Sequence, residues 1–101
     1  MKESFEATLD VNGISIELNP FIEKFLSRTV MAAVSSLREA EDMHRLELSL
    51  NKEDLNIIVD GNDIALTAFP QQIIIGTVKG LVSSLKGIDV IDILSIKIAP
   101  L

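Results

Sequence analysis

The sequence predicts an α+β protein, a two-layer sandwich in which a mainly antiparallel sheet carries two helices on one face. Three observations lead to this fold. Short segments alternate apolar and polar residues like half-buried strands, and two longer segments have the one-sided apolar pattern of amphipathic helices. The order strand, strand, helix, strand occurs twice. We therefore predict a single domain over residues 1–101, built as a tandem ββαβ duplication.

The duplication is visible when the chain is aligned with itself at an offset of 48 residues, which places residues 5–50 on residues 53–98. Twelve of the 46 ungapped pairs are identical, where chance would give about three. Residues 34–37 and 82–85 share the sequence Val-Ser-Ser-Leu. Two copies are too few for a solenoid, so we predict two pseudo-symmetric repeats within one domain.

Each repeat begins with a predicted hairpin. In the first repeat, alternation over 5–11 and 14–18 flanks Asn12-Gly13, the dipeptide most typical of a two-residue turn, and Val11 should pair with Ile14. In the second repeat, alternation over 55–59 is followed by a predicted turn over 60–63. There Val59 should pair with Ile64, so the two hairpins would differ in register by two positions without changing the buried face.

The helices are predicted from their caps and their apolar faces. Asn19 is a favourable N-cap with Pro20 at the first helical position, and Thr67 takes the corresponding position in the second repeat. Gly87 has the place of a glycine that ends the second helix. We expect the helices to bury the following residues: Phe21, Phe25, Val30, Ala33, Val34 and Leu37, and Phe69, Ile74, Val78, Leu81, Val82 and Leu85. Among the residues expected to point outward are Glu23, Lys24, Ser27 and Arg28, and Gln71, Gln72 and Lys79.

The third strands of the repeats are predicted at residues 46–50 and 91–98, which again alternate. A split arrangement would place the third strand of each repeat beside its own first strand, with a right-handed helical crossover. The sequence leaves open how the halves join. The segment Asn51–Asp54 is short enough for a hairpin, which would pair the third strand with the fourth.

Composition excludes several functional classes. The chain has a net charge of −6 and a pI of about 4.6, without the basic face that nucleic acids or anionic membrane surfaces require. The absence of cysteine excludes disulfides and thiol chemistry. No apolar stretch approaches the length of a membrane span, and the N-terminus has no signal-peptide pattern, so we expect a cytoplasmic protein. No motif implies a cofactor.

Residues with possible chemistry are sparse. His44 is the single histidine, and with Asp42 or Glu41 it would form a proton-transfer pair or part of a metal site. A solvated acidic loop is the favoured interpretation, because one imidazole beside carboxylates has no ligand spacing. The segment 60–63, Asp-Gly-Asn-Asp, resembles a fragment of a calcium loop but lacks the later ligands, so a tight turn is favoured. We predict no catalytic and no metal-binding residue.

The repeated Ser-Ser pairs give the one candidate binding site. Each pair is followed by a leucine and a basic residue near a predicted helix end. Under a pseudo-two-fold axis, four hydroxyls and two cations would converge on an anionic ligand. The alternative is that two helix surfaces stayed alike through common descent, with the cation favourable at the helix end. The candidate residues are Ser35, Ser36, Arg38, Ser83, Ser84 and Lys86.

Other features favour association with a protein. Gly76 and Gly80 lie four residues apart in the second helix, where glycine is costly, and such a pair lets another helix or a second chain approach. Ile58, Ile75 and Ile93 depart from the core pattern and would form an association patch if clustered.

The run Ile-Glu-Leu-Asn-Pro-Phe at residues 16–21, followed by Val-Ser-Ser-Leu at 34–37, resembles short uncharacterised archaeal proteins with a hairpin, a helix and a strand. The resemblance covers one repeat at a time, and residues 81–87 echo it in the second repeat. It implies that this chain fuses two such units and that single-unit relatives dimerise. It implies no activity.

From these observations we predict a non-enzymatic protein that acts through association, as a homodimer or with another protein. The alternative is a binder of small anionic ligands, or an enzyme, that uses the groove between the repeats. The two are distinguished by the surface: a lined concave pocket favours the alternative, and an exposed apolar patch favours association.

Overall fold

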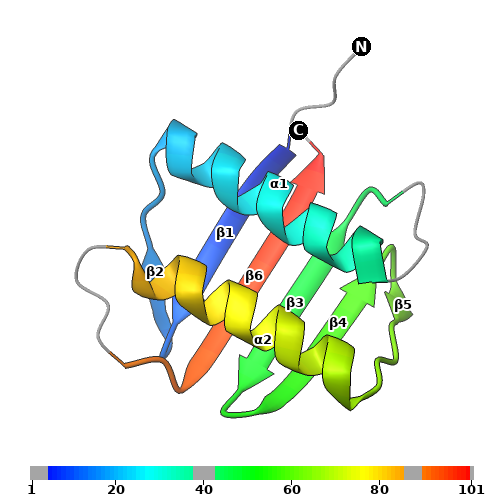
Figure 1. Cartoon of the computed structure of the whole chain (residues 1–101). Coiled ribbons are helices and arrows are strands. Elements are labelled where there is room, and N and C mark those ends of the chain that lie inside the picture. Colours follow the sequence, from blue (N-terminus) through cyan, green and yellow to red (C-terminus); the bar gives the residue numbers. More distant parts are fainter. Residues whose placement is uncertain (1–4, 38–42, 86–89, 101) are drawn as a thin grey trace.

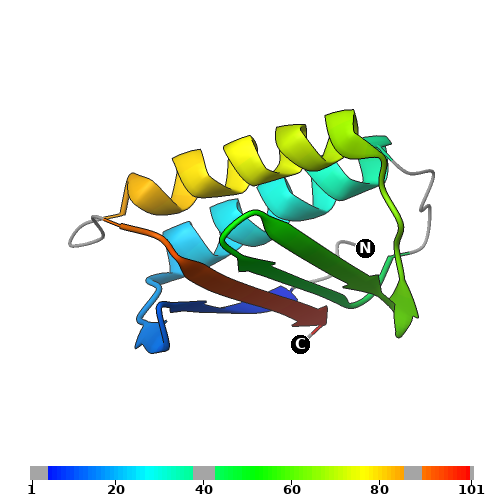
Figure 2. The same cartoon turned by 90° about the horizontal axis from the view of Figure 1, so that it is seen from below.

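The computed structural model describes residues 5–37, 43–85 and 90–100. It has two layers, a six-stranded antiparallel sheet and two helices that both cover one face of it (Figures 1 and 2). Each helix follows a β-hairpin, which confirms the predicted α+β class. The described helices include none that is long and apolar enough to cross a bilayer.

The elements follow the predicted order. The helices are α1 (Pro20–Leu37) and α2 (Ala68–Ser83). The strands are β1 (Phe5–Val11), β2 (Ile14–Ile16), β3 (Leu46–Asn51), β4 (Asp54–Val59), β5 (Asn62–Asp63) and β6 (Ile93–Pro100). The strand order across the sheet is β2-β1-β6-β3-β4-β5.

This order corrects the predicted split arrangement. The third strand of each repeat lies beside the first strand of the other repeat, because β1 pairs with β6 and β4 pairs with β3. Since β1 and β3 are both antiparallel to β6, they are parallel to each other with β6 between them. The hairpin through Asn51–Asp54 joins β3 to β4, and its turn residue Lys52 has φ 58°.

The pairing registers repeat at the offset of 48 found in the sequence. Leu9 pairs with Ile96, and 48 residues later Ile57 pairs with Leu48. At the centre of the sheet Leu48 pairs with Ile96, two residues that are themselves 48 apart. A pseudo-two-fold axis therefore passes between these two side chains.

The registers of the two hairpins are also related by the offset of 48 residues. The register predicted from the sequence for the second hairpin is therefore wrong. Asn12 and Gly13 have φ values of 53° and 81°, and Val11 pairs with Ile14 as predicted. In the second repeat Val59 pairs with Asn62 and not with Ile64. The reason is that Asp60 (φ 50°) and Gly61 (φ 83°) alone make a two-residue turn, so both hairpins have the same register.

The turn residues Asn12 and Asp60 also tie the sheet together. The Asn12 Oδ1 atom accepts hydrogen bonds from the N–H groups of Asp92 (2.8 Å) and Ile93 (3.0 Å), and its Nδ2 atom donates to the Val90 carbonyl (2.7 Å). In each repeat the hairpin turn thus binds the start of the neighbouring third strand. Residues separated by about 80 positions are joined at the surface by one side chain.

Both helices begin after the predicted N-cap residues, but only one of the two caps makes a side-chain hydrogen bond. The Asn19 Oδ1 atom accepts a hydrogen bond from the Ile22 N–H at 2.8 Å, and Pro20 begins α1. Thr67 is the N-cap of α2, but its side chain makes no capping hydrogen bond.

The core lies between the layers and is aliphatic. Leu26, Val30 and Val34 of α1, and Ile74, Ile75, Val78 and Val82 of α2, are buried against alternate residues of the four central strands. The prediction that Phe21, Phe25 and Phe69 are buried is wrong. Ser27 and Ile75, expected off the core face, are buried at 2% and 6% exposure. The predicted burial of Leu37 lies outside the described side chains.

Candidate association surface

The start of α1 exposes two phenylalanines. Phe21 is 71% and Phe25 50% exposed. They lie four residues apart on one side of the helix, and their rings stack with centroids 6.2 Å apart at an interplanar angle of 3°. Since α1 turns Leu26, Val30 and Val34 toward the sheet, residues 21 and 25 are carried to the solvent side. Aromatic side chains this exposed are uncommon on a surface that stays in water.

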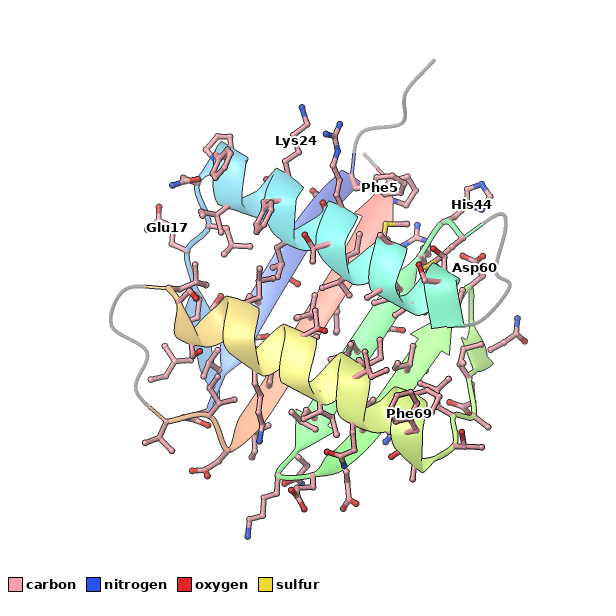
Figure 3. The ribbon with its side chains drawn as sticks, in the orientation of Figure 1. Phe5, Glu17, Lys24, His44, Asp60 and Phe69 are labelled. Carbon is pink, nitrogen blue, oxygen red and sulfur yellow. The ribbon has the colours of Figure 1, made fainter. Side chains whose placement is uncertain are left out.

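The start of α2 repeats this arrangement. Phe69 is 74% and Ile73 39% exposed, and these residues are the counterparts of Phe21 and Phe25 at the offset of 48. Phe69 projects from the first turn of α2, on the side of the helix that is remote from the sheet (Figure 3). Because α1 and α2 run in opposite directions (Figure 1), the two apolar pairs lie at opposite ends of the helix layer.

A cavity of about 190 Å³ lies beside the first pair. Ile22, Phe25 and Leu26 line it from the start of α1, and Leu81, Ser84 and Leu85 line it from the end of α2. The Ser84 hydroxyl is already bonded to the Gly80 carbonyl at 2.8 Å. The lining is therefore almost wholly apolar, which suits an aliphatic or aromatic side chain better than an anion.

Gly76 and Gly80 lie on the same outer side of α2. A Cβ atom added to either glycine would meet nothing within 4 Å. The glycines therefore do not serve the packing of α2 against α1, which was one of the two reasons predicted for them. They leave a shallow, backbone-lined strip beside the projecting Phe69 and Ile73.

The helix layer is basic although the protein is acidic. Within their described bounds the helices carry Lys24, Arg28 and Lys79 and a single acidic residue, Glu23. The Glu23 carboxylate is half-buried and accepts a hydrogen bond from the Ala7 N–H. The strands, in contrast, carry five acidic residues and one lysine. Lys24 extends from α1 into solvent (Figure 3).

The structure does not bring the predicted serine site together. Ser35 and Ser36 lie at the end of α1, whereas Ser83 and Ser84 lie at the end of α2, at opposite ends of the antiparallel helix pair (Figure 1). The hydroxyls of Ser35 and Ser83 each bond a carbonyl three residues earlier in their own helix, at 3.2 Å. Arg38 and Lys86 lie outside the described residues. The four hydroxyls therefore share no binding site.

His44 lies beside Asp60 (Figure 3). Its Nδ1 atom is 4.0 Å from Asp60 Oδ2, with 58% of the His44 side chain exposed. Asp60 Oδ1 accepts hydrogen bonds from the N–H groups of Arg45 (2.7 Å) and His44 (3.0 Å). The Arg45 N–H is the main cause that lowers the pKa of Asp60 below its usual 3.8. Desolvation opposes this shift, and the His44 N–H adds a smaller lowering of the pKa.

These contacts give Asp60 a structural role, the same as that of Asn12 in the first repeat, and agree with the predicted tight turn. Glu41 and Asp42, the other partners considered for His44, lie outside the described residues. Among the residues that the structure describes, no three potential metal ligands come together.

Comparison with known proteins adds no function. No family model matches the chain. No curated protein matches it, and no solved structure does.

The exposed phenylalanines are the feature that the sequence analysis missed. Two apolar stripes run along α1, one through residues 21 and 25 and one through 26, 30 and 34. The apolar character of phenylalanine by itself assigns the first stripe to the core as well. The signal that separates them is continuity, since only the second stripe extends over the whole helix.

Proposed function

We propose that this is a non-enzymatic cytoplasmic protein that acts through association, and that two copies pair through the outer side of the helix layer. We call this surface the helix face and define it by Phe21, Phe25, Phe69, Ile73, Gly76 and Gly80. The observation that carries the proposal is that the three phenylalanines of the helix face are each exposed by half or more. Together they offer water about 300–500 Å² of aromatic surface, divided between the two ends of the helix layer.

The shape of the helix face favours a second copy as the partner. An isologous interface needs projections and recesses on one surface, since each copy supplies both. Here the projecting phenylalanines lie beside the open strip over Gly76 and Gly80. The opposite surface of the molecule, the outer side of the sheet, is polar, with Thr8, Glu47 and Ser49 exposed. Ile58 and Ile93, which the sequence suggested as part of a patch, are separated there by β3, and Ile75 is in the core.

The repeat geometry suggests how the chain itself arose, through a pairing of single units by their strands that is separate from the helix face. We propose that the chain arose by duplication of a ββαβ unit, and the recurrence of every register at an offset of 48 supports this. Because each third strand pairs with the first strand of the other repeat, a single unit would complete its sheet only in a dimer. The archaeal resemblance of the sequence remains a prediction.

Sedimentation velocity and native mass spectrometry of the full chain test the proposal. The wild type should be a dimer. The double variant Phe21→Glu, Phe69→Glu should be monomeric with an unchanged circular dichroism spectrum, because both side chains are exposed. Thr8→Glu, an exposed position on the sheet, is the matched control and should stay dimeric. A monomeric wild type, or a double variant that still dimerises, would contradict the proposal.

Two further measurements separate a second copy from another partner. Gly80→Ala has room in one copy but should weaken a dimer that packs against the glycine strip. Added NaCl should tighten the dimer, because it screens repulsion between the cations of the two helix faces. Dissociation at high salt would instead point to an acidic partner.

A further inference from the structure

The edge strands of the sheet leave part of its rim uncovered. β5 pairs with Ile58 and Val59, and the Ile64 N–H donates to the Ile57 carbonyl at 2.9 Å. The chain then leaves the edge, so that none of the described strands lies beside the first residues of β4 on that side. The equivalent uncovered stretch on the other edge is the beginning of β1.

The direction of the backbone groups at this edge follows from the pairing. In a strand the N–H and C=O groups of one residue point to the same side, and the side alternates along the chain. Since the Ile57 carbonyl points toward β5, the N–H and C=O of Leu55 point away from β3, toward the open edge. Ala7 has the corresponding orientation in β1, because 7 and 55 are 48 residues apart.

The two edges differ at this point. In the first repeat the Glu23 carboxylate accepts a hydrogen bond from the Ala7 N–H at 2.9 Å and closes the edge. The counterpart of Glu23 is Gln71, whose Nε2 atom donates instead to the Leu66 carbonyl at 2.7 Å. Among the described residues no hydrogen bond to the Leu55 N–H is found. Within the part of the chain that the structure describes, no hydrogen bond to the Leu55 carbonyl is found either, so this stretch of the β4 edge offers a donor and an acceptor.

A pocket of about 330 Å³ opens next to these groups. Its lining includes Leu55, Ile57, Ile64, Leu66, Asp63 and Gln71. The aliphatic residues would accommodate an apolar side chain. The described lining contains no cation, and Asp63 supplies a negative charge where the first repeat has Ser15. Asp54, the first residue of β4, adds a second carboxylate to this edge.

From these observations we infer that the β4 edge binds an extended peptide segment of basic character. The peptide backbone would pair with the N–H and C=O of Leu55, as in other cases of strand addition to a sheet edge. One apolar side chain would occupy the pocket, and a lysine or arginine beside it would lie near Asp63. This site is distinct from the helix face, so that either can fail without the other.

The test uses the ¹⁵N-labelled full chain and two blocked peptides, acetyl-Lys-Val-Lys-Val-Lys-amide and acetyl-Glu-Val-Glu-Val-Glu-amide. The lysine peptide should shift the Leu55 amide resonance in NMR titrations, and the glutamate peptide should not. No shift at Leu55 with the lysine peptide, or equal binding of the two peptides, would overturn the inference.

A substitution that places the residue type of Glu23 at the equivalent position 71 tests the role of the Leu55 N–H. In Gln71→Glu the new carboxylate should cap the Leu55 N–H as Glu23 caps Ala7, and weaken binding of the lysine peptide by at least about tenfold. Gln72→Glu adds the same charge at an exposed neighbour and should bind as the wild type does. If Gln71→Glu binds as tightly as Gln72→Glu, the free edge is not the binding site. Conversely, Glu23→Ala removes the acceptor of the Ala7 N–H and should open the β1 edge, so that the Ala7 amide responds to the peptide.

Discussion

The contacts of Asn12 give a quantitative test of how the two repeats are joined. In Asn12→Ala three hydrogen bonds to residues 90, 92 and 93 are lost. At an exposed site each is worth about 0.5–1 kcal/mol. Alanine at the φ of 53° found here adds about 1 kcal/mol of backbone strain. The free energy of unfolding should fall by about 2.5–4 kcal/mol, a large part of the stability of a small domain.

Two further substitutions separate these contributions. Asn12→Gly removes the hydrogen bonds but tolerates the positive φ, so its cost should be smaller, about 1.5–3 kcal/mol. Asn12→Asp keeps the acceptor oxygens and loses only the donor to Val90, and it reproduces the residue found at position 60. It should be the mildest of the three.

Thermal and urea unfolding followed by circular dichroism measure these differences. The midpoint temperature of Asn12→Ala should fall by about 10–30 °C, at about 4–8 °C per kcal/mol for a chain of this size. If Asn12→Asp is as unstable as Asn12→Ala, the acceptor oxygen does not stabilise the start of β6, and the reasoning is refuted.

Two other predictions concern the acid stability and the core. The lowered pKa of Asp60 means that its stabilising contribution is complete above pH 3.8 and is lost as the pH falls through the lower folded-state value. Asp60→Asn should therefore lose less stability than the wild type between neutral and strongly acidic pH in urea titrations, and an identical loss would contradict this. Ile75→Ala should cost about 2–4 kcal/mol because Ile75 is buried. Ser27→Ala at the matching position should change the free energy of unfolding by less than about 0.5 kcal/mol, because the described hydrogen bonds of the Ser27 hydroxyl go to carbonyls of its own helix. A larger loss of stability would contradict this explanation.

Local features of the fold could be predicted from the sequence because their causes are local. The alternation in β1 and β3, the turn at Asn12-Gly13 and the cap at Asn19 each depend on residues within a few positions of one another. The same reasoning failed at Val59, where Asp60-Gly61 competed with a longer turn. Both turns keep the same residues on the buried face, so burial alone did not separate them.

The order of the strands could not be predicted for a similar reason. Placing β6 or β3 beside β1 buries the same alternate residues, and the difference lies only in which distant segment completes the pairing. The hydrogen bonds from Asn12 to the start of β6 favour the observed neighbour of β1, but these partners are about 80 residues away and cannot be recognised in the sequence. The serine site was predicted from symmetry alone, and the antiparallel helices place the two pairs apart.

The exchanged strands also determine how the molecule must unfold. Neither repeat contains a complete half of the sheet, because β1 and β2 are completed by β6 from the second repeat, and β4 and β5 by β3 from the first. The central pair β3 and β6 joins the two halves through Leu48 and Ile96, which are both fully buried. Separating the repeats would therefore expose the middle of the core, so the two repeats form one cooperative unit although the sequence contains two similar halves.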